Sequence, residues 1–147
     1  MRIRPMTISD ADAVAALSGQ LGYPLSADTI RERISVVSTN VEHAALMAED
    51  DGGHPLGWIH VFVAHFIESP NSFVEIGGLV VDGNARGLGV GRALVLAVEQ
   101  WAIQHGFDDI RVRSASRRTE AHAFYEHLGY ELQKTQLRFV KKLPPQF

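Results

Sequence analysis

The stretch Arg86-Gly87-Leu88-Gly89-Val90-Gly91-Arg92 lies between an apolar run and a helical pattern. The run before it, Ile76-Gly77-Gly78-Leu79-Val80-Val81, predicts a strand, and apolar residues recur at helical spacing from Val90 to Trp101. The glycines therefore lie where a strand turns into a helix. A helix N-terminus offers unpaired N–H groups and a positive dipole end, and glycines let a ligand come close, so the stretch predicts a phosphate or pyrophosphate site.

Two common types of glycine-rich loop are excluded because their sequence patterns do not match. A P-loop needs Lys after its last glycine, where this chain has Arg92. A dinucleotide-binding loop needs glycine at its sixth position, which is Arg92 when counted from Gly87 and Leu94 when counted from Gly89. Its acidic ribose partner should end the next strand, whereas the acidic pair 108–109 precedes that strand.

Two motifs together carry a family resemblance. The spelling Arg-x-x-Gly-x-Gly of residues 86–91 resembles the acetyl-CoA loop of the GNAT superfamily of N-acetyltransferases. Residues 121–131, Ala-His-Ala-Phe-Tyr-Glu-His-Leu-Gly-Tyr-Glu, are similar to the Ala-x-x-Phe-Tyr-Glu-x-x-Gly-Phe/Tyr segment of that superfamily. The second motif follows the first after one predicted helix and one predicted strand, as the resemblance requires. The chain is therefore identified as a member of the superfamily over nearly its whole length.

Composition narrows the class of protein. The 147 residues predict one domain, spanning 1–147. The chain has no cysteine, which excludes disulfides, thiolate zinc sites and a cysteine nucleophile, and its histidines have no metal-ligand spacing, so no metal is expected. The net charge of −3 argues against a nucleic-acid partner. No apolar run approaches about 18 residues and the start lacks a signal peptide, so we expect no membrane partner and a cytoplasmic location.

The pattern along the chain predicts the element order β-α-α-β-β-β-α-β-α-β. Strands are expected at 3–5, 43–49, 55–66, 73–81, 110–114 and 130–140, and helices after Thr7 or Ser9, after Ser26, at 89–105 and at 118–128. The resemblance implies an α/β (α+β) fold, with a mixed, mostly antiparallel sheet of six to seven strands flanked by about four helices. In that fold the strands before the loop and after the long helix splay apart, and pantetheine enters between them.

The resemblance also implies acetyl-CoA as the co-substrate. Backbone N–H groups from Arg86 to Gly91, next to Arg92, would hold the pyrophosphate. The main chain of Leu79, Val80 and Val81 would bind pantetheine as an added strand does, and an N–H near Leu79 or Val80 would polarise the thioester oxygen. The pair Gly77-Gly78 predicts a β-bulge that re-aims this N–H, or a place where a neighbouring side chain needs room.

Tyr125 and Glu75 are the catalytic candidates. Tyr125 matches the tyrosine that protonates the leaving thiolate, although its helical spacing is equally that of a core face. Glu75 matches the strand position of the base in the histone-acetyltransferase branch. Before any bulge, strand alternation would place it on one face with Leu79. It could equally be an exposed strand carboxylate. Other candidates for the base are His60, His65, Glu68 and His122.

Arg118 departs from the family pattern. Many members carry an Asn at this position, seven residues before Tyr125, where it helps to hold the cofactor. A guanidinium could contact a cofactor phosphate instead, or it could lie in solvent at a helix start.

The leading hypothesis is an N-acetyltransferase in which a primary amine attacks acetyl-CoA directly in a ternary complex. Glu68, Glu75 and the negative net charge favour a small cationic amine. Protein or peptide acceptors, a longer acyl donor, and a non-catalytic acyl-CoA-binding module are the alternatives. We expect the first two helices, the connector 22–24 and the loop 66–73 to bind the acceptor, and a homodimer to form through the final strand or a sheet edge.

Overall fold

The computed structural model describes residues 1–22 and 24–146. The chain divides into two compact units, Met1–Arg113 and Ser114–Phe147. Tyr23, in the middle of the connector 22–24, and Phe147 lie outside the described residues. The first unit contains the sheet and the glycine loop, and the second contains the Phe-Tyr segment.

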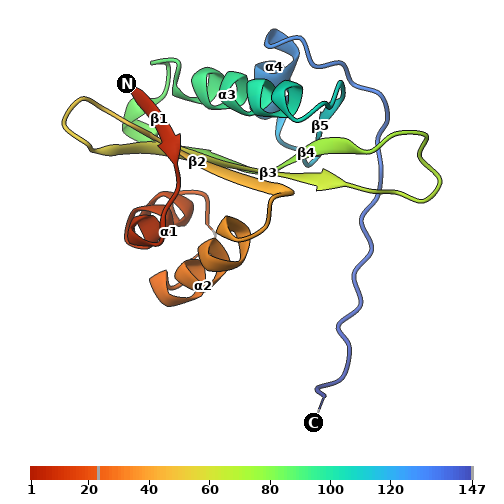
Figure 1. Cartoon of the computed structure of the whole chain (residues 1–147), viewed down its shortest axis with the longest axis horizontal. Coiled ribbons are helices and arrows are strands. Elements are labelled where there is room, and N and C mark those ends of the chain that lie inside the picture. The colour runs from red at the N-terminus through yellow and green to blue at the C-terminus, as the bar shows by residue number, and fades with distance from the viewer. Residues whose placement is uncertain (23, 147) are drawn as a thin grey trace. The chain divides into compact units, whose positions relative to one another are not determined.

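The first unit is built on one five-stranded sheet (Figure 1). Its strands lie in chain order, and β1 to β4 pair antiparallel, whereas β5 runs parallel to β4. They are β1 (Arg2–Pro5), β2 (His43–Glu49), β3 (Pro55–Ala64), β4 (Phe73–Val81) and β5 (Ile110–Val112). The predicted mixed, mostly antiparallel sheet is thus confirmed.

Helices cover both faces of this sheet (Figure 1). Helices α1 (Ala11–Gly19) and α2 (Ala27–Ser38) pack on one face, and α3 (Val90–Gln104) packs on the other. A parallel strand pair needs a crossover connection, and α3 supplies it between β4 and β5. The predicted cap of the second helix is confirmed, since Ser26 Oγ accepts a hydrogen bond from Thr29 N.

Short 3₁₀ turns precede two of these helices. The turn η1 (Ile8–Asp10) begins at the predicted cap Thr7, and α1 follows at Ala11. The turn η2 (Gly83–Ala85) lies between β4 and the glycine loop. Asp82 caps η2 by accepting from Asn84 N.

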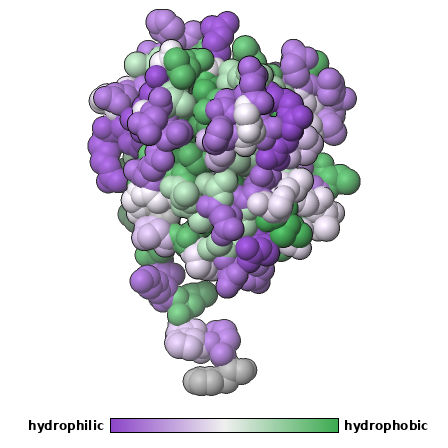
Figure 2. All heavy atoms as spheres, turned by 90° about the vertical axis from the view of Figure 1, so that its left-hand side faces the viewer, coloured by the Kyte–Doolittle hydropathy of each residue, from purple (hydrophilic) through white to green (hydrophobic). Residues whose placement is uncertain are grey.

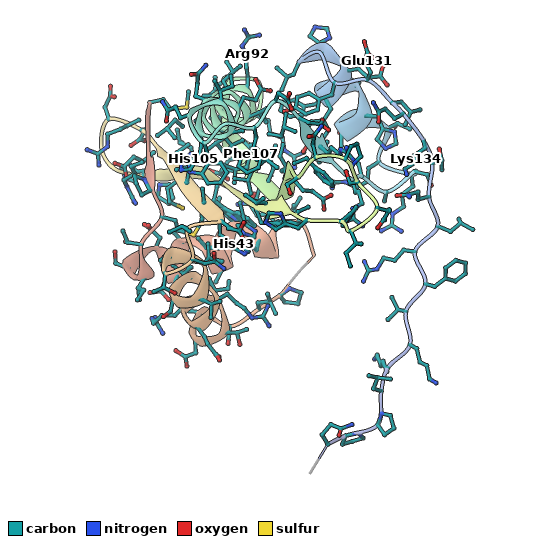
Figure 3. The ribbon with its side chains drawn as sticks, turned by 45° about the vertical axis from the view of Figure 1, so that its right-hand side comes forward. His43, Arg92, His105, Phe107, Glu131 and Lys134 are labelled. Atoms are coloured by element: carbon teal, nitrogen blue, oxygen red, sulfur yellow. The ribbon has the colours of Figure 1, made fainter. Side chains whose placement is uncertain are left out.

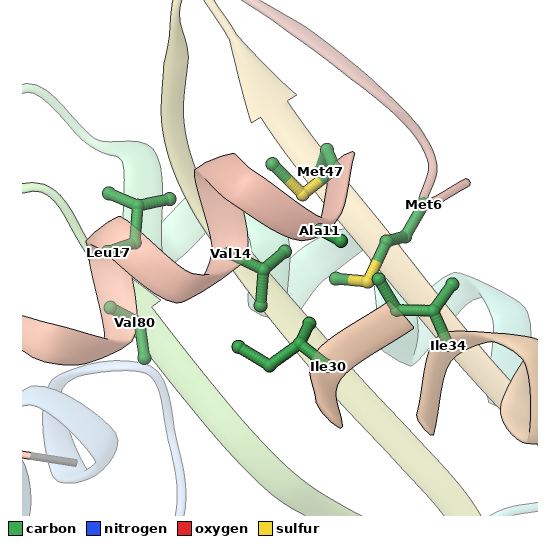
Figure 4. Close-up of a cluster of buried hydrophobic side chains, with 8 residues drawn as sticks. All are labelled: Met6, Ala11, Val14, Leu17, Ile30, Ile34, Met47 and Val80. Atoms are coloured by element: carbon green, nitrogen blue, oxygen red, sulfur yellow. The ribbon is translucent and has the colours of Figure 1, made fainter. Parts of the chain in front are cut away.

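One apolar cluster joins the sheet to the helices on the face covered by α1 and α2, which we call the α1/α2 face (Figure 4). Its members come from both helices, from the segment after β1, and from the sheet: Met6, Ala11, Val14, Leu17, Ile30, Ile34, Met47 and Val80. The buried side chains of α3 are equally apolar: Val90, Leu94, Val95, Val98 and Ala102. Burial of this kind stabilises the fold by about 1.5–3 kcal/mol for each large aliphatic side chain.

The second unit contains one helix, α4 (Thr119–His127), and ends in residues without regular secondary structure. The predicted strand 130–140 is wrong for this structure, so the sheet has five strands instead of six to seven. A strand needs a neighbouring strand for its backbone hydrogen bonds, and the described part of the chain gives this segment none. Its apolar residues stay exposed, Leu137 to 81% and Phe139 to 89%.

Among residues 1–22 and 24–146, no helix is long and apolar enough to cross a membrane. The longest, α3, has 15 residues, whereas a span needs about 20. Figure 2 shows one side of the molecule, with hydrophilic residues over much of its surface and hydrophobic groups between them.

Candidate active site

The glycine loop enters α3 through left-handed backbone. Gly87 and Gly89 both have φ of 81°, a conformation that residues with a Cβ rarely adopt, so glycine is required at both positions. Gly89 is the N-cap of α3, and no side chain caps the helix there. The first N–H groups of α3 therefore remain available to an anion, and residues 86–89 are exposed to solvent. The predicted strand-to-helix position of the loop is confirmed.

A glutamine side chain ties α1 to the start of this loop. Gln20 Nε2 donates to Asp82 Oδ1 over 3.1 Å, and Gly83 N donates to Gln20 Oε1 over 2.9 Å. Sequence reasoning missed Gln20, because 62 residues separate it from Asp82 and no motif joins them.

The strand that leads to the loop contains the predicted β-bulge. His60 of β3 pairs with Gly78, whereas the next residue of β3 pairs with Ile76, so Gly77 is the extra residue. A Cβ on Gly77 would lie 3.0 Å from His60 Nδ1, and a Cβ on Gly78 would lie 2.8 Å from the Trp58 ring. Both predicted explanations of the glycine pair hold, since the strand bulges and neighbouring side chains fill the space.

The hydrogen bonds of β4 indicate which N–H groups face away from β3. Asp82 N donates to Leu56 O of the β3 side over 2.8 Å. Because antiparallel pairing alternates, the N–H of Val80 also points to β3, and those of Leu79 and Val81 point to the opposite edge. Of the two predicted donors, Leu79 is the one whose N–H points away from β3.

On that opposite edge, β5 pairs with β4 over three residues only. The pairing runs from Val74 to Ile76 and ends at Val112 of β5. From Gly77 onward, β4 has no partner on β5. This is the place where the resemblance implies that the two strands part.

The bulge changes which residues share a face. Val80 pairs with Trp58 on the α1/α2 face, and Glu75 pairs with Phe62, which alternation places on that same face of β3. Leu79 pairs with a residue of the opposite face. Alternation without a bulge would place Glu75 and Leu79 on one face. The extra residue of the bulge shifts the alternation between them, so they lie on opposite faces.

Glu75 is a buried carboxylate in an ion pair. Its Oε2 accepts from Arg113 Nη2 over 2.9 Å, and Arg113 Nε lies 3.2 Å and 3.3 Å from its two oxygens. The Glu75 side chain is only 10% exposed and that of Arg113 is 70% exposed. The alternative of an exposed strand carboxylate is therefore wrong.

A pair of histidines lies on the same face as Glu75. His43 Nδ1 and His60 Nε2 are 2.9 Å apart, and their rings are nearly parallel, at 8°. Burial, and next the charge of His43, lower the pKa of His60 to about 4, so its ring is neutral at neutral pH. Figure 3 shows His43 on the side of the sheet that faces α1 and α2, with Arg92 on α3 at the other side. Sequence reasoning missed this pair, which strand pairing alone brings together.

The remaining candidates for the base lie elsewhere. His65 is on the surface and contacts Glu42 and Ser72, each at 2.5 Å, and Glu68 is exposed in the loop after β3. His122 belongs to the second unit, where its Nε2 lies 2.8 Å from Ala115 O. Within the described residues, no group of three or more His, Asp or Glu side chains could hold a metal ion.

In the second unit, Arg118 is the N-cap residue of α4 and Tyr125 lies on this helix. Burial raises the pKa of the Tyr125 phenol, and the positive charge of Arg118 partly opposes this. The Tyr125 ring is flanked by the rings of Phe124 and Tyr130, at centroid distances of 5.1 Å and 5.6 Å. The phenol is therefore protonated at neutral pH and can donate its proton.

Comparison with known proteins agrees with these features. The sequence model of the acetyltransferase (GNAT) family matches residues 17–130. An aminoglycoside N(6')-acetyltransferase type 1 of Stenotrophomonas maltophilia is 31% identical over 148 residues, which cover 97% of this chain and 94% of that protein.

Solved structures share the fold. The aminoglycoside 6'-N-acetyltransferase AAC(6')-IG of Acinetobacter haemolyticus has a TM-score of 0.84 at 18% identity, over 98% of this chain and 100% of that one. AAC(6')-Iy, in complex with the bisubstrate analogue CoA-S-monomethyl-acetylneamine, has a TM-score of 0.85 at 20% identity, over 97% and 98%. At these identities the two structures confirm the fold alone.

Proposed function

Because this chain belongs to the acetyltransferase (GNAT) family, we propose that it moves the acetyl group of acetyl-CoA to a small cationic amine, which attacks directly in a ternary complex. The family and the relative both support an N-acetyltransferase activity, with acetyl-CoA as the co-substrate. The observation that supports the detailed proposal is the bulge at Gly77 within β4. From this residue onward β4 has no partner on β5, and the strand leads to the uncapped N-terminus of α3.

In this proposal acetyl-CoA lies along the unpaired edge of β4. The N–H groups of Leu79 and Val81 donate hydrogen bonds to the amide-rich pantetheine arm and to the thioester oxygen. The pantetheine arm thus pairs with β4 as an added strand would. The pyrophosphate lies at the N-terminus of α3, held by the N–H groups of residues 86–91. Arg92 and Arg118 add positive charge for the phosphates.

The chemistry needs one proton donor and one proton acceptor. The amine nitrogen attacks the thioester carbon, the C–S bond breaks, and the Tyr125 hydroxyl protonates the leaving sulfur. Before the attack, Glu75 takes one proton through water from the ammonium form of the acceptor, because only the neutral amine has a lone pair. The second proton leaves the nitrogen as the C–N bond forms, and it replaces the proton that Tyr125 gives to sulfur. Support for Tyr125 comes from its raised pKa and its place in the motif. Support for Glu75 comes from its burial on β4, two residues before the bulge at Gly77.

The acceptor that we propose is an aminoglycoside-type amine. The relative with 31% identity is an aminoglycoside N(6')-acetyltransferase. One solved structure of the same fold contains an analogue in which acetylneamine is joined to CoA. A buried carboxylate and a net charge of −3 favour a cation over a neutral amine.

We also propose that two copies associate through residues 130–140. The segment has the apolar pattern of a strand, and Leu137 and Phe139 remain exposed in the single chain. A sheet edge of a second copy would supply the backbone hydrogen bonds that it lacks. Light scattering of the full chain and of a chain ending at residue 129 tests this, because only the full chain should have the mass of a dimer.

The deciding experiment is a thiol-release screen with acetyl-CoA against aminoglycosides, polyamines, amino acids and peptides with free N-termini. We expect release with cationic small amines, and a mass increase of the amine by one acetyl group. Release with peptides alone would replace the proposed acceptor, and binding of acetyl-CoA without release to any amine would leave only a binding module.

A further inference from the structure

Arg113 is the only described side chain that bonds to Glu75. It follows the last residue of β5, where this strand stops pairing with β4. The ion pair therefore spans the start of the gap between the two strands. Its two partners differ in exposure, since the carboxylate is nearly buried and the guanidinium is mostly in solvent.

We propose that Arg113 is a positioning residue that covers Glu75 in the free enzyme and is displaced by the ammonium group of the acceptor. This inference rests on the proposed function, and it adds how the site selects its acceptor. The guanidinium acts as an internal competitor that occupies the place of the substrate cation.

The argument starts from the cost of an unpaired buried charge. If Arg113 moves away, Glu75 keeps a buried carboxylate without a partner, which is strongly unfavourable unless another cation replaces the guanidinium. Arg113 can leave at small cost, because its side chain is 70% exposed and is rehydrated when it swings out. A neutral amine cannot compensate Glu75, so the exchange selects a cationic acceptor.

The surroundings offer no second cation for Glu75 among the described residues. Arg111, two residues earlier on β5, is held by Asp109 over 2.8 Å and lies over the Phe73 ring at 3.7 Å. On β3 and β2 the titratable neighbours are His60 and His43, which bond to each other. The helices that pack on this face present apolar side chains: Val14 and Leu17 from α1, and Ile30 and Ile34 from α2.

The test compares Arg113→Gln with Arg111→Gln as a matched control. Both changes remove one arginine, Arg111 within β5 or Arg113 directly after it, but only the change at Arg113 removes the competitor. With neamine as the acceptor, Arg113→Gln should lower KM by about threefold to fivefold, the range expected for one partly exposed ion pair, while kcat changes little. Arg111→Gln should leave both constants as they are, and Arg113→Lys should restore most of the wild-type KM.

A KM for neamine that is unchanged or higher in Arg113→Gln would overturn the inference, because the guanidinium would then not compete. Calorimetric titration of acetyl-CoA and thermal unfolding of each variant exclude a loss of folding as the cause. If the wild-type protein acetylates no amine, the proposed function fails. The inference is then decided by calorimetry with neamine, whose Kd must still fall in Arg113→Gln.

Discussion

The His60 side chain fills the space that a side chain on Gly77 would need. A Cβ on Gly77 would lie 3.0 Å from His60 Nδ1 and 3.3 Å from the Phe62 ring, and both of these side chains are fixed on the neighbouring strand. The glycine thus lets the extra residue of the bulge fit against His60. The bulge, in turn, sets the direction of the Leu79 N–H and the face on which Glu75 lies.

Gly77→Ala should therefore disturb both stability and catalysis. The added methyl group forces His60 or the bulge to move, and overpacking of this kind costs about 1–3 kcal/mol. Turnover should fall by at least tenfold, because the thioester oxygen would lose the donor that we propose for it, the N–H of Leu79. Urea unfolding and steady-state kinetics measure the two effects. Gly19→Ala, in α1, is the control, since nothing lies within 4 Å of its Cβ. It should leave turnover unchanged and should not lower stability, because alanine favours a helix over glycine. Equal losses in the two variants would contradict this account.

Glu75→Gln should lower kcat by about a hundredfold if Glu75 accepts the proton of the amine. The amide keeps the size of the side chain but cannot take a proton. The Kd of acetyl-CoA should stay the same. A variant with wild-type turnover would show that another group is the base.

Tyr125→Phe should lower turnover by at least tenfold with the fold intact. The phenylalanine ring fills the same space, so the variant loses only the hydroxyl that we propose as the proton donor. Because burial raises the pKa of Tyr125, loss of activity through its deprotonation should occur only above pH 10 in the wild-type enzyme. The measurements are kcat against pH and the circular dichroism of both proteins. Unchanged turnover in the variant would remove the role of Tyr125.

His60 should make the protein less stable as the solution becomes acidic. Its pKa is about 4 in the folded state and 6.5 ordinarily, so the unfolded chain binds the extra proton between these values. The free energy of unfolding should be constant above pH 6.5 and fall by up to about 3 kcal/mol toward pH 4. Urea unfolding at half-unit steps of pH measures this.

In His60→Gln the slope between pH 4 and 6.5 should flatten. The exposed His54, changed to Gln, is the control and should keep the wild-type slope. Asp10 adds acid sensitivity at lower pH, because Arg4 lowers the pKa of this carboxyl from 3.8. A wild-type slope in His60→Gln would assign the acid sensitivity to other groups.

Gln20→Ala should weaken acetyl-CoA binding without touching the chemical step. The two hydrogen bonds of Gln20 hold Asp82 and Gly83 in front of the glycine loop, and each exposed bond is worth about 0.5–1.5 kcal/mol. We expect the Kd for acetyl-CoA to rise threefold to tenfold in calorimetry, with kcat at saturation unchanged. Gln100→Ala, on the exposed side of α3, should bind as the wild type does.

Local patterns predicted the parts of the site that depend on backbone conformation. The positive φ of Gly87 and Gly89 and the bulge at Gly77 follow from what glycine permits in a loop and in a strand. The helix boundaries follow from capping residues such as Ser26, whose hydrogen bond is local.

Relations between distant segments were not predictable from one sequence. The face of Glu75 depends on the register of β3 against β4, and one extra residue reverses it. The His43–His60 pair and the Gln20–Asp82 bridge join strands or helices that no spacing connects. The strand predicted at residues 130–140 is absent, because a sequence pattern does not say where a partner strand lies.

The short pairing of β4 with β5 has a consequence for the behaviour of the empty enzyme. An unpaired strand edge is a template for association with other chains, and soluble proteins normally cover such edges. Here the proposed cover is the cofactor, so acetyl-CoA would act as a removable protective strand. The protein should then tolerate heat and concentration better as acetyl-CoA rises above its Kd, gaining about 2.7 kcal/mol at a hundredfold excess over Kd. Cells depleted of acetyl-CoA would hold this enzyme in its most aggregation-prone form.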